Sequence, residues 1–193
     1  MRIHVTGNAG AGKTTLACRL GSALGLPVIH LDQIVWRSGW RTTPQDQQAA
    51  SLRSAVAPKS WVIEGVSGFV RGQADIVVFL DVPRRVCLWR CLMRNWRYSF
   101  RSRPELPDAC PEILVVPRLL RIIWRFPALV GTQIHEEALA ASKYQVIRHQ
   151  SNLEHWLHEF TAAQAAKPPH AASTEMDKVP KVNRWRRVAD AER

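Results

Sequence analysis

The chain has 193 residues, 46% of them hydrophobic, which suffices for one domain of ordinary size with a buried core. No apolar run approaches ~18 residues and the N-terminal segment lacks the apolar stretch of a signal peptide, so we expect no membrane span and a cytoplasmic location. The net charge of +11 favours anionic partners such as nucleotide phosphates, nucleic acid or acidic proteins.

The first segment of the chain predicts a strand, a loop and a helix. Arg2–Thr6 alternates in polarity and contains β-branched residues, as a strand does. Gly7–Gly12 is a glycine-rich turn. Thr14–Leu24 repeats leucine at helical spacing, and Gly25 is a natural helix end.

Strands and helices then alternate along the chain. Further strands are predicted at Val28–Leu31, Trp61–Glu64, Ile76–Leu80 and Tyr144–Arg148. Helices are predicted at Pro44–Ala57, Pro83–Arg97, Arg118–Phe126, Gly131–Ser142 and Asn152–Ala165. This alternation predicts an α/β fold in which a parallel sheet is covered by helices on both faces.

Residues 1–165 are predicted to form one domain. Within it, Ser99–Pro117 contains four prolines and is predicted to be a loop or a short mobile segment. After Ala166 the composition changes to Pro, Ala, Ser and charged residues, so residues 166–193 are predicted to be a disordered tail. The helix at Pro83–Arg97 has an apolar side formed by Val86, Trp89, Leu92 and Met93.

Four cysteines are present, and we expect buried thiols rather than a metal site or disulfides. They are Cys18, Cys87, Cys91 and Cys110. A zinc site needs a fourth ligand and closely spaced pairs, which this pattern lacks.

Arginine is concentrated between Arg84 and Arg125. This stretch holds ten arginines, no lysine and three acidic residues, hence a net charge of +7 over 42 residues. Because the guanidinium fork binds phosphate through two hydrogen bonds, the stretch indicates contact with phosphate groups.

The turn after the first strand matches the phosphate-loop pattern G-x-x-x-x-G-K-[ST] at every fixed position. Glycines let backbone N–H groups turn towards a phosphate, and the following helix directs its N-terminus at the anion. Lys13 is predicted to reach the β- and γ-phosphates, and the Thr14 hydroxyl to bind Mg²⁺. The residues predicted to bind ATP are Gly7, Asn8, Ala9, Gly10, Ala11, Gly12, Lys13, Thr14 and Thr15.

Three acids are candidates for the metal or base role, because each ends a predicted strand. They are Asp81 after Ile76–Leu80, Glu64 in Trp61–Glu64, and Asp32 after the second strand. A carboxylate at the carboxyl end of a parallel strand faces the crevice where ligands bind. On the residues alone, the choice between Asp81 and Glu64 stays open.

Six segments together resemble a known family. They are GNAGAGKTT, HLDQIVWRSGW at His30–Trp40, WVIEG at Trp61–Gly65, FLDVPRRVCLWRCLMR at Phe79–Arg94, RSRPELPDACPE at Arg101–Glu112 and IIWRFP at Ile122–Pro127. Over about residues 2–160 the chain resembles the bacterial adenylate-kinase-like proteins often labelled "DNA topology modulation protein". The resemblance implies a nucleoside or nucleotide kinase-like fold with strand order 2-3-1-4-5.

In such kinases the acid that ends the third strand lies beside the phosphates and the metal. The resemblance therefore favours Glu64, with Thr14, on the metal side and gives Asp81 a more structural role. The family's third strand usually ends in Asp-Gly-Asn, whereas this chain has Glu64-Gly65-Val66. The missing amide bears on turnover and acceptor choice more than on ATP binding.

Kinases of this group close an arginine-bearing lid over the transferring phosphoryl group. The resemblance implies such a lid at about residues 95–117, with Arg90 and Arg94 at its base and Arg101 and Arg103 within it. Arginines there stabilise the charge on the equatorial oxygens, and closure excludes water.

The segment His30–Trp40 lies where such kinases bind the phosphoryl acceptor. Asp32 is a candidate hydrogen-bond acceptor for a hydroxyl, and Arg37 a candidate partner of an acceptor phosphate. Trp36 and Trp40 are candidates for stacking on a ring, unless they simply pack the helix on the sheet. His30 we expect to be a core histidine.

Three functions follow from these expectations. The first is a kinase that transfers the γ-phosphoryl of ATP, with Mg²⁺, to a small nucleotide, nucleoside or other hydroxyl acceptor through Lys13, Glu64 and the arginines. The second is a nucleotide-dependent regulator linked to DNA topology. The third is an ATP sensor without turnover. The sequence indicates neither the acceptor nor the oligomeric state.

Overall fold

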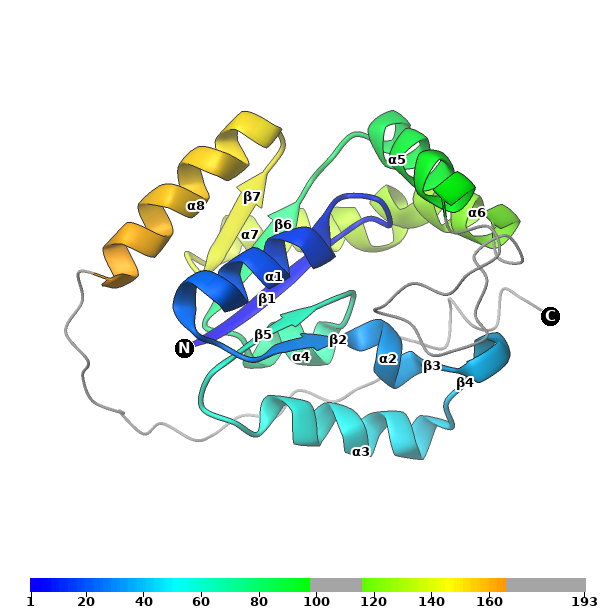
Figure 1. Ribbon diagram of the computed structural model, residues 1–193, viewed down its shortest axis with the longest axis horizontal. Helices are drawn as coiled ribbons and strands as arrows, with labels where there is room; N and C mark the ends of the chain where they lie inside the picture. The colour runs from blue at the N-terminus through cyan, green and yellow to red at the C-terminus, as the bar shows by residue number, and fades with distance from the viewer. Residues whose placement is uncertain (98–115, 166–193) are drawn as a thin grey trace.

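The computed structural model describes residues 1–97 and 116–165, and Figure 1 shows their arrangement. Five strands form one parallel sheet in the order β2-β5-β1-β6-β7. Their bounds are β1 Arg2–Gly7, β2 Val28–His30, β5 Trp61–Glu64, β6 Ile76–Leu80 and β7 Tyr144–Ile147. Numbered along the chain as the five strands of this sheet, the order is 2-3-1-4-5, which confirms the predicted sheet.

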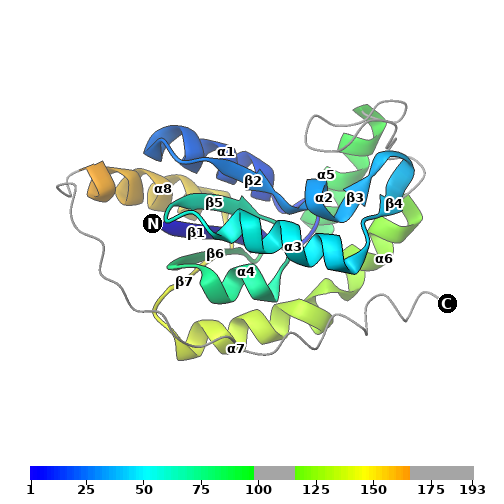
Figure 2. The same ribbon diagram turned by 90° about the horizontal axis from the view of Figure 1, so that it is seen from below.

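Helices cover both faces of the sheet. Their bounds are α1 Lys13–Leu24, α2 Leu31–Val35, α3 Gln45–Val56, α4 Gly68–Gln73, α5 Arg84–Arg97, α6 Val116–Phe126, α7 Thr132–Ala140 and α8 Gln150–Ala165. Figure 2 shows α1 and α8 on one face and α4 and α7 on the other. A separate two-stranded ribbon lies beside α2, beyond the end of the sheet; it consists of β3 Trp36–Arg37 and β4 Arg41–Thr42 around the 3₁₀ turn η1 Ser38–Trp40.

The core consists of side chains that alternate between the two faces of the strands. Ile3 and Val5 of β1 pack in one buried cluster with Leu16 of α1. Trp61 and Ile63 of β5 point the other way and belong to a second buried cluster. This is the period of two expected of strands that are buried on both sides.

Several elements surround the end of the sheet at which the strands have their carboxyl ends. They are α2 with β3–β4, α5 and α6 (Figures 1 and 2).

Helix α4 is absent from the sequence prediction. It spans Gly68–Gln73 and begins at Ser67, whose hydroxyl accepts a hydrogen bond from the Val70 N–H at 3.3 Å. Two glycines in six residues lower its intrinsic helix propensity, so the capping serine and burial of Val70 hold it in place. Leu31, predicted to end the second strand, instead begins α2.

The predicted apolar side of α5 is wrong. Cys87 and Cys91 are fully buried, whereas Val86, Trp89, Leu92 and Met93 are between 37% and 64% exposed. The helix lies against the glycine-rich loop at Gly10, where an added Cβ would come within 2.5 Å of the Cys87 carbonyl oxygen. The backbone of α5 thus packs closely on Gly10, the inner face of the helix carries Cys87 and Cys91, and the large apolar residues face outwards.

The thiols follow the prediction in part. Cys87 and Cys91 are buried as expected, but Cys18 on α1 is exposed, which contradicts the expectation for that residue. Cys110 lies outside the described residues. Within residues 1–97 and 116–165, no cluster of three or more His, Cys, Asp or Glu side chains has the arrangement of a metal site.

The predicted lid falls mostly outside the described residues. Residues 95–97 belong to α5 and residues 116–117 to α6. Arg101 and Arg103 lie in the undescribed part, as does the predicted tail at 166–193. Among the described helices, none is long and apolar enough to cross a membrane.

Candidate active site

The loop between β1 and α1 has the backbone that its glycines predict. Gly10 and Gly12 adopt positive φ angles of 77° and 98°, a region that other L-residues rarely enter. Gly12 directly precedes Lys13, the first residue of α1. The loop thus wraps around the N-terminus of a twelve-residue helix, which is a favourable place for a phosphate.

Asn8 fixes this loop to a neighbouring helix. Its side-chain oxygen accepts from the Ala9 N–H at 2.8 Å, and its Nδ2 donates to the Ile123 carbonyl of α6 at 2.9 Å. The Lys13 ammonium donates to the Asn8 carbonyl at 3.0 Å, which holds it over the loop. The side chain of Asn8 therefore positions α6, whereas its backbone belongs to the phosphate loop.

Glu64 lies at the end of β5, beside the loop. Its Oε1 accepts from the Thr14 hydroxyl at 3.2 Å and from His30 Nδ1 at 3.0 Å. Burial alone would raise the pKa of Glu64, but the hydrogen bond from His30 and the charge of Lys13 outweigh burial and lower this pKa. Glu64 is therefore an ionised carboxylate, and the His30 nitrogen that faces it carries a proton.

Asp81 has a different environment. Its Oδ2 accepts from Arg148 Nε at 3.0 Å and lies 3.2 Å from His135 Nε2. These contacts join the end of β6 to α7 and to the residue after β7. The geometry thus separates the two acids: Glu64 contacts the Thr14 hydroxyl, and Asp81 contacts His135 of α7 and Arg148 after β7.

A cavity of about 730 Å³ opens beside the phosphate loop. This volume is within the range of pockets that hold small ligands. Its walls come from the loop and the start of α1, the segment from α2 to η1, the end of β5, α5 and α6. The lining residues are Ala9, Gly10, Gly12, Lys13, Thr14, Thr15, Cys18, Leu31, Asp32, Val35, Trp36, Trp40, Glu64, Gly65, Val66, Arg90, Arg94, Arg118, Leu119, Ile122 and Phe126.

The structure brings together most of the predicted acceptor residues. Asp32, Trp36 and Trp40 line the cavity. The two indole rings meet edge to face, with centroids 5.5 Å apart. Arg37 is exposed and donates a hydrogen bond to Gln47 at the start of α3, away from the cavity wall.

The two predicted arginines on α5 also face this cavity. Arg90 and Arg94 are one helical turn apart, and both contribute to its wall. The Arg90 guanidinium lies 3.5 Å from the Ala11 carbonyl of the loop. Lys13 lines the same cavity.

The sequence prediction omitted one wall of the cavity and one hydrogen-bonding partner. The wall is α6, which contributes Arg118, Leu119, Ile122 and Phe126. A helix was predicted at Arg118–Phe126, but nothing in the sequence indicated which element this helix faces. The partner is His30, whose position at a strand end, one strand away from Glu64, was the available signal.

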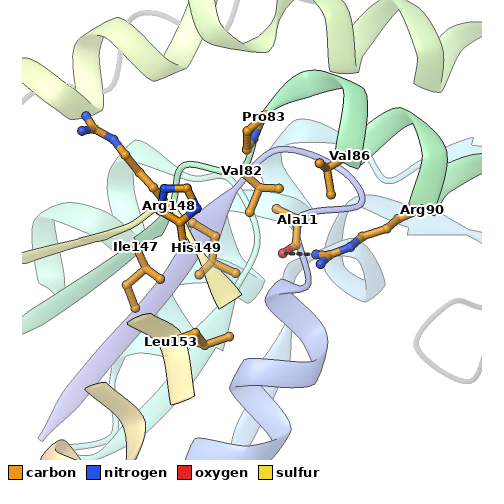
Figure 3. Close-up of a pocket in the computed structure, with 10 residues that line it drawn as sticks. Ala11, Val82, Pro83, Val86, Arg90, Ile147, Arg148, His149 and Leu153 are labelled. Atoms are coloured by element: carbon orange, nitrogen blue, oxygen red, sulfur yellow. Dashed lines mark hydrogen bonds between the residues drawn. The ribbon is translucent and has the colours of Figure 1, made fainter. Parts of the chain in front are cut away.

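A second, smaller cavity of about 220 Å³ lies on the other side of the loop. Figure 3 shows Arg90 reaching from α5 to the Ala11 carbonyl. Pro83 and Val86 at the start of α5 and His149 after β7 are among its lining residues. The loop thus has a narrow, largely apolar site on one flank and a wide cavity on the other.

Solved structures provide a likeness in fold. A shikimate kinase from Acinetobacter baumannii in complex with shikimate is 18% identical, with a TM-score of 0.51 over 86% of this chain and 93% of that chain. A shikimate kinase from Bacteroides thetaiotaomicron is 20% identical, with a TM-score of 0.48 over 86% and 98%. A sugar kinase from Janibacter sp. HTCC2649 is 17% identical, with a TM-score of 0.47 over 85% and 94%.

The fold is therefore that of the P-loop kinases. At these identities the likeness concerns the fold alone, because one fold carries many functions. No protein-family model and no curated protein sequence matches this chain.

Proposed function

We propose that this chain is a phosphotransferase that binds ATP with Mg²⁺ at the loop Gly7–Thr14 and transfers the γ-phosphoryl group to a small hydroxyl acceptor in the 730 Å³ cavity. The observation that carries the proposal is the convergence of Lys13, Thr14 and Glu64 with Arg90 and Arg94 on that cavity. Phosphoryl transfer depends mainly on positioning and on charges around the reacting phosphate, and this set supplies both.

The two cavities suggest the orientation of the donor. The smaller cavity is bounded by Pro83, Val86 and Leu153, and apolar side chains of this kind suit the faces of an adenine ring. The phosphates would then follow the loop around Ala11, with the γ-phosphate on the side of the large cavity. Arg90 borders both cavities, so its guanidinium can contact a phosphate that passes between them.

The residues present fit a magnesium ion. The Thr14 hydroxyl and the Glu64 carboxylate are 3.2 Å apart, both are oxygen ligands, and Glu64 is ionised. When bound, Mg²⁺ neutralises charge on the β- and γ-phosphates. His30 holds the carboxylate in place through its 3.0 Å hydrogen bond, which fixes where Glu64 can act.

The chain's own residues then account for the transfer. Asp32 accepts a hydrogen bond from the acceptor hydroxyl, whose oxygen forms the new bond to phosphorus as the bond to the β-phosphate oxygen breaks. The hydroxyl proton passes to a carboxylate that lines the cavity, Asp32 or Glu64, and ADP leaves with the electron pair. Lys13, Arg90 and Arg94 stabilise the negative charge of the transferring group.

The proposal also includes the enzyme group and the cellular compartment. The motifs at Gly7–Thr14, His30–Trp40 and Phe79–Arg94 support an adenylate-kinase-like enzyme similar to the proteins labelled "DNA topology modulation protein". The reaction would take place in the cytoplasm, with Arg101 and Arg103 as proposed lid arginines and Arg37 as a proposed rim contact for the acceptor.

The proposal is tested by ATP binding and by ADP release. We expect calorimetry to detect Mg²⁺-dependent ATP binding, and a coupled assay to detect ADP release stimulated by one class of acceptor among nucleotides, nucleosides and hydroxy acids. Replacing Lys13 by Ala removes a charged hydrogen-bond donor and should weaken ATP binding by roughly 10- to 100-fold. Unchanged ATP affinity in that variant would disprove the donor site.

A second candidate, an ATP sensor without turnover, is favoured by one observation. Val66 lines the cavity at the position where the similar family usually has an amide. ATP binding without acceptor-stimulated ADP release would favour this function. DNA binding that depends on ATP would instead favour a DNA-linked regulator.

A further inference from the structure

The part of the large cavity that is lined by the α2–η1 segment and by α6 is mostly apolar. One side is the α2–η1 segment, with Leu31, Val35, Trp36 and Trp40, and the other is α6, with Leu119, Ile122 and Phe126. Among the described lining residues of these two elements, the charged side chains are Asp32 and Arg118. The acceptor half thus combines flat and branched apolar surface with one carboxylate and one guanidinium.

This composition disfavours an acceptor rich in hydroxyl groups. Each hydroxyl that enters an apolar wall loses its hydrogen bonds to water and costs about 1–3 kcal/mol unless a partner replaces them. Asp32 can accept from the hydroxyl that reacts and from one neighbour, but the remaining wall offers few further partners. The face of a planar ring loses no hydrogen bonds in this way, and it gains contact with the two indole rings.

The cation on α6 adds a second requirement. The Arg118 guanidinium carbon lies 5.3 Å from the centroid of the Trp36 ring, so the guanidinium lies beside the indole face. A ring that contacts Trp36 therefore places its substituents next to a fixed cation with a planar, bidentate fork.

A hydrogen bond ties α6, the helix that carries Arg118, to the phosphate loop. Asn8 belongs to the loop and donates to the Ile123 carbonyl of α6 at 2.9 Å. Ile123 itself is fully buried, so α6 is held at one distance from the loop. The distance between this wall and the site of the transferred phosphate therefore limits the size of an acceptor that contacts both.

We infer that the acceptor is a hydroxyl compound built on a planar ring and carrying an anionic group, and that Trp36 and Arg118 are the pair that selects it. The inference rests on the proposed function, because it names the acceptor of that transfer. A polyol or sugar acceptor would lack the planar ring, and a neutral nucleoside would lack the anionic group.

Calorimetric titration of the full chain without ATP tests the inference directly. Nucleoside 5′-monophosphates and pyridoxine 5′-phosphate serve as ring anions of two ring types, nucleosides as rings without the anion, and shikimate and gluconate as anions without an aromatic ring. We expect at least one ring anion to bind at least tenfold more tightly than every member of the other two groups.

Matched variants separate the two requirements. Arg118→Gln should reduce the preference of the best ring anion over its uncharged counterpart by at least fivefold, whereas Arg121→Gln, on the same helix but outside the cavity lining, should leave it unchanged. Trp36→Leu should reduce its preference over shikimate and gluconate, whereas Trp89→Leu, an exposed tryptophan on α5, should not.

The inference is overturned if shikimate or gluconate binds best, if no ring anion binds, or if Arg118→Gln and Arg121→Gln behave alike. These outcomes are distinct from failure of the proposed function. Transfer of phosphate from ATP to gluconate would leave the kinase proposal intact and remove the ring requirement. Absence of ATP binding would remove the kinase proposal, while the titrations would still show whether Trp36 and Arg118 select a ring anion.

Discussion

At the scale of single residues, the main question is which carboxylate acts at the phosphates. Glu64 and Asp81 both follow buried strands and are indistinguishable by position in the sequence. Their partners differ: Glu64 accepts from the Thr14 hydroxyl and from His30, whereas Asp81 accepts from Arg148 and lies beside His135. A hydrogen bond to the phosphate loop, rather than a place at a strand end, is what distinguishes the two acids.

This difference predicts opposite results for two isosteric substitutions. Glu64→Gln removes the charge beside Thr14 and should lower turnover on the order of 10²-fold or more, with ATP affinity changed much less. Asp81→Asn should retain most of the turnover, because its ion pairs with Arg148 and His135 are partly exposed. Steady-state ADP release and calorimetric ATP binding measure both effects. Larger loss of turnover in Asp81→Asn would reverse the assignment.

At the scale of elements, α6 depends on a contact from the phosphate loop. Asn8 is almost fully buried, and its amide bonds both the Ala9 N–H and the Ile123 carbonyl. Asn8→Ala leaves this buried carbonyl without a partner, which costs about 1–3 kcal/mol. We expect the melting temperature to fall by roughly 2–10 °C for a chain of this size. Gln48→Ala, which removes a partly buried bond to Thr43, is a control expected to show a smaller decrease.

The same substitution should also act on the cavity. Because α6 carries Arg118 and three apolar lining residues, a looser α6 should weaken acceptor binding more than ATP binding. Titration of the folded variant with each ligand below its melting temperature measures this split. Equal loss of both affinities would show that Asn8 supports the loop alone.

The orientation of α5 gives a second test at this scale. Met93 is 51% exposed, whereas Cys91, two residues earlier, is fully buried. Met93→Gln should change the free energy of unfolding by less than about 0.5 kcal/mol. Cys91→Gln places a larger, polar side chain in the core and should cost about 2 kcal/mol or more. Urea unfolding of both variants tests the observed face, and the reverse order would support the face that the sequence indicated.

At the scale of the whole molecule, the sequence predicted local features better than contacts between elements. The phosphate loop was predictable because its glycine positions, lysine and threonine are tied to one backbone shape. All five strands of the sheet were predictable from short apolar runs. The inner face of α5 was not, because it depends on where the backbone at Cys87 packs on Gly10 of the loop, a contact that periodicity does not encode. Arg118 was missed for the same reason, since its role depends on which element α6 faces.

The free energy of unfolding depends on pH, and the contribution of one residue, His4, can be measured separately. His4 lies in the central strand β1, is fully buried, and donates from Nε2 to the Gly65 carbonyl at 3.1 Å. Burial is the largest cause that lowers the pKa of His4, to about 3, and the charge of Arg71 acts in the same direction. Glu64 and the bond to Gly65 act in the opposite direction but are weaker, and Lys143 adds to the lowering. In the folded chain His4 is therefore neutral far below its ordinary pKa of 6.5.

This shift sets the sign of a pH effect on stability. Below pH 6.5 the unfolded chain binds a proton at His4 that the folded chain excludes, so the free energy of unfolding falls as the pH falls, until about pH 3. The slope due to this residue is about 1.4 kcal/mol per pH unit well inside that window. His4→Gln keeps a donor for the Gly65 carbonyl and has no proton to bind. Urea unfolding at pH 7, 6 and 5 should therefore show a shallower loss of stability in His4→Gln than in the parent chain, and parallel curves would mean that His4 does not stay neutral in the fold.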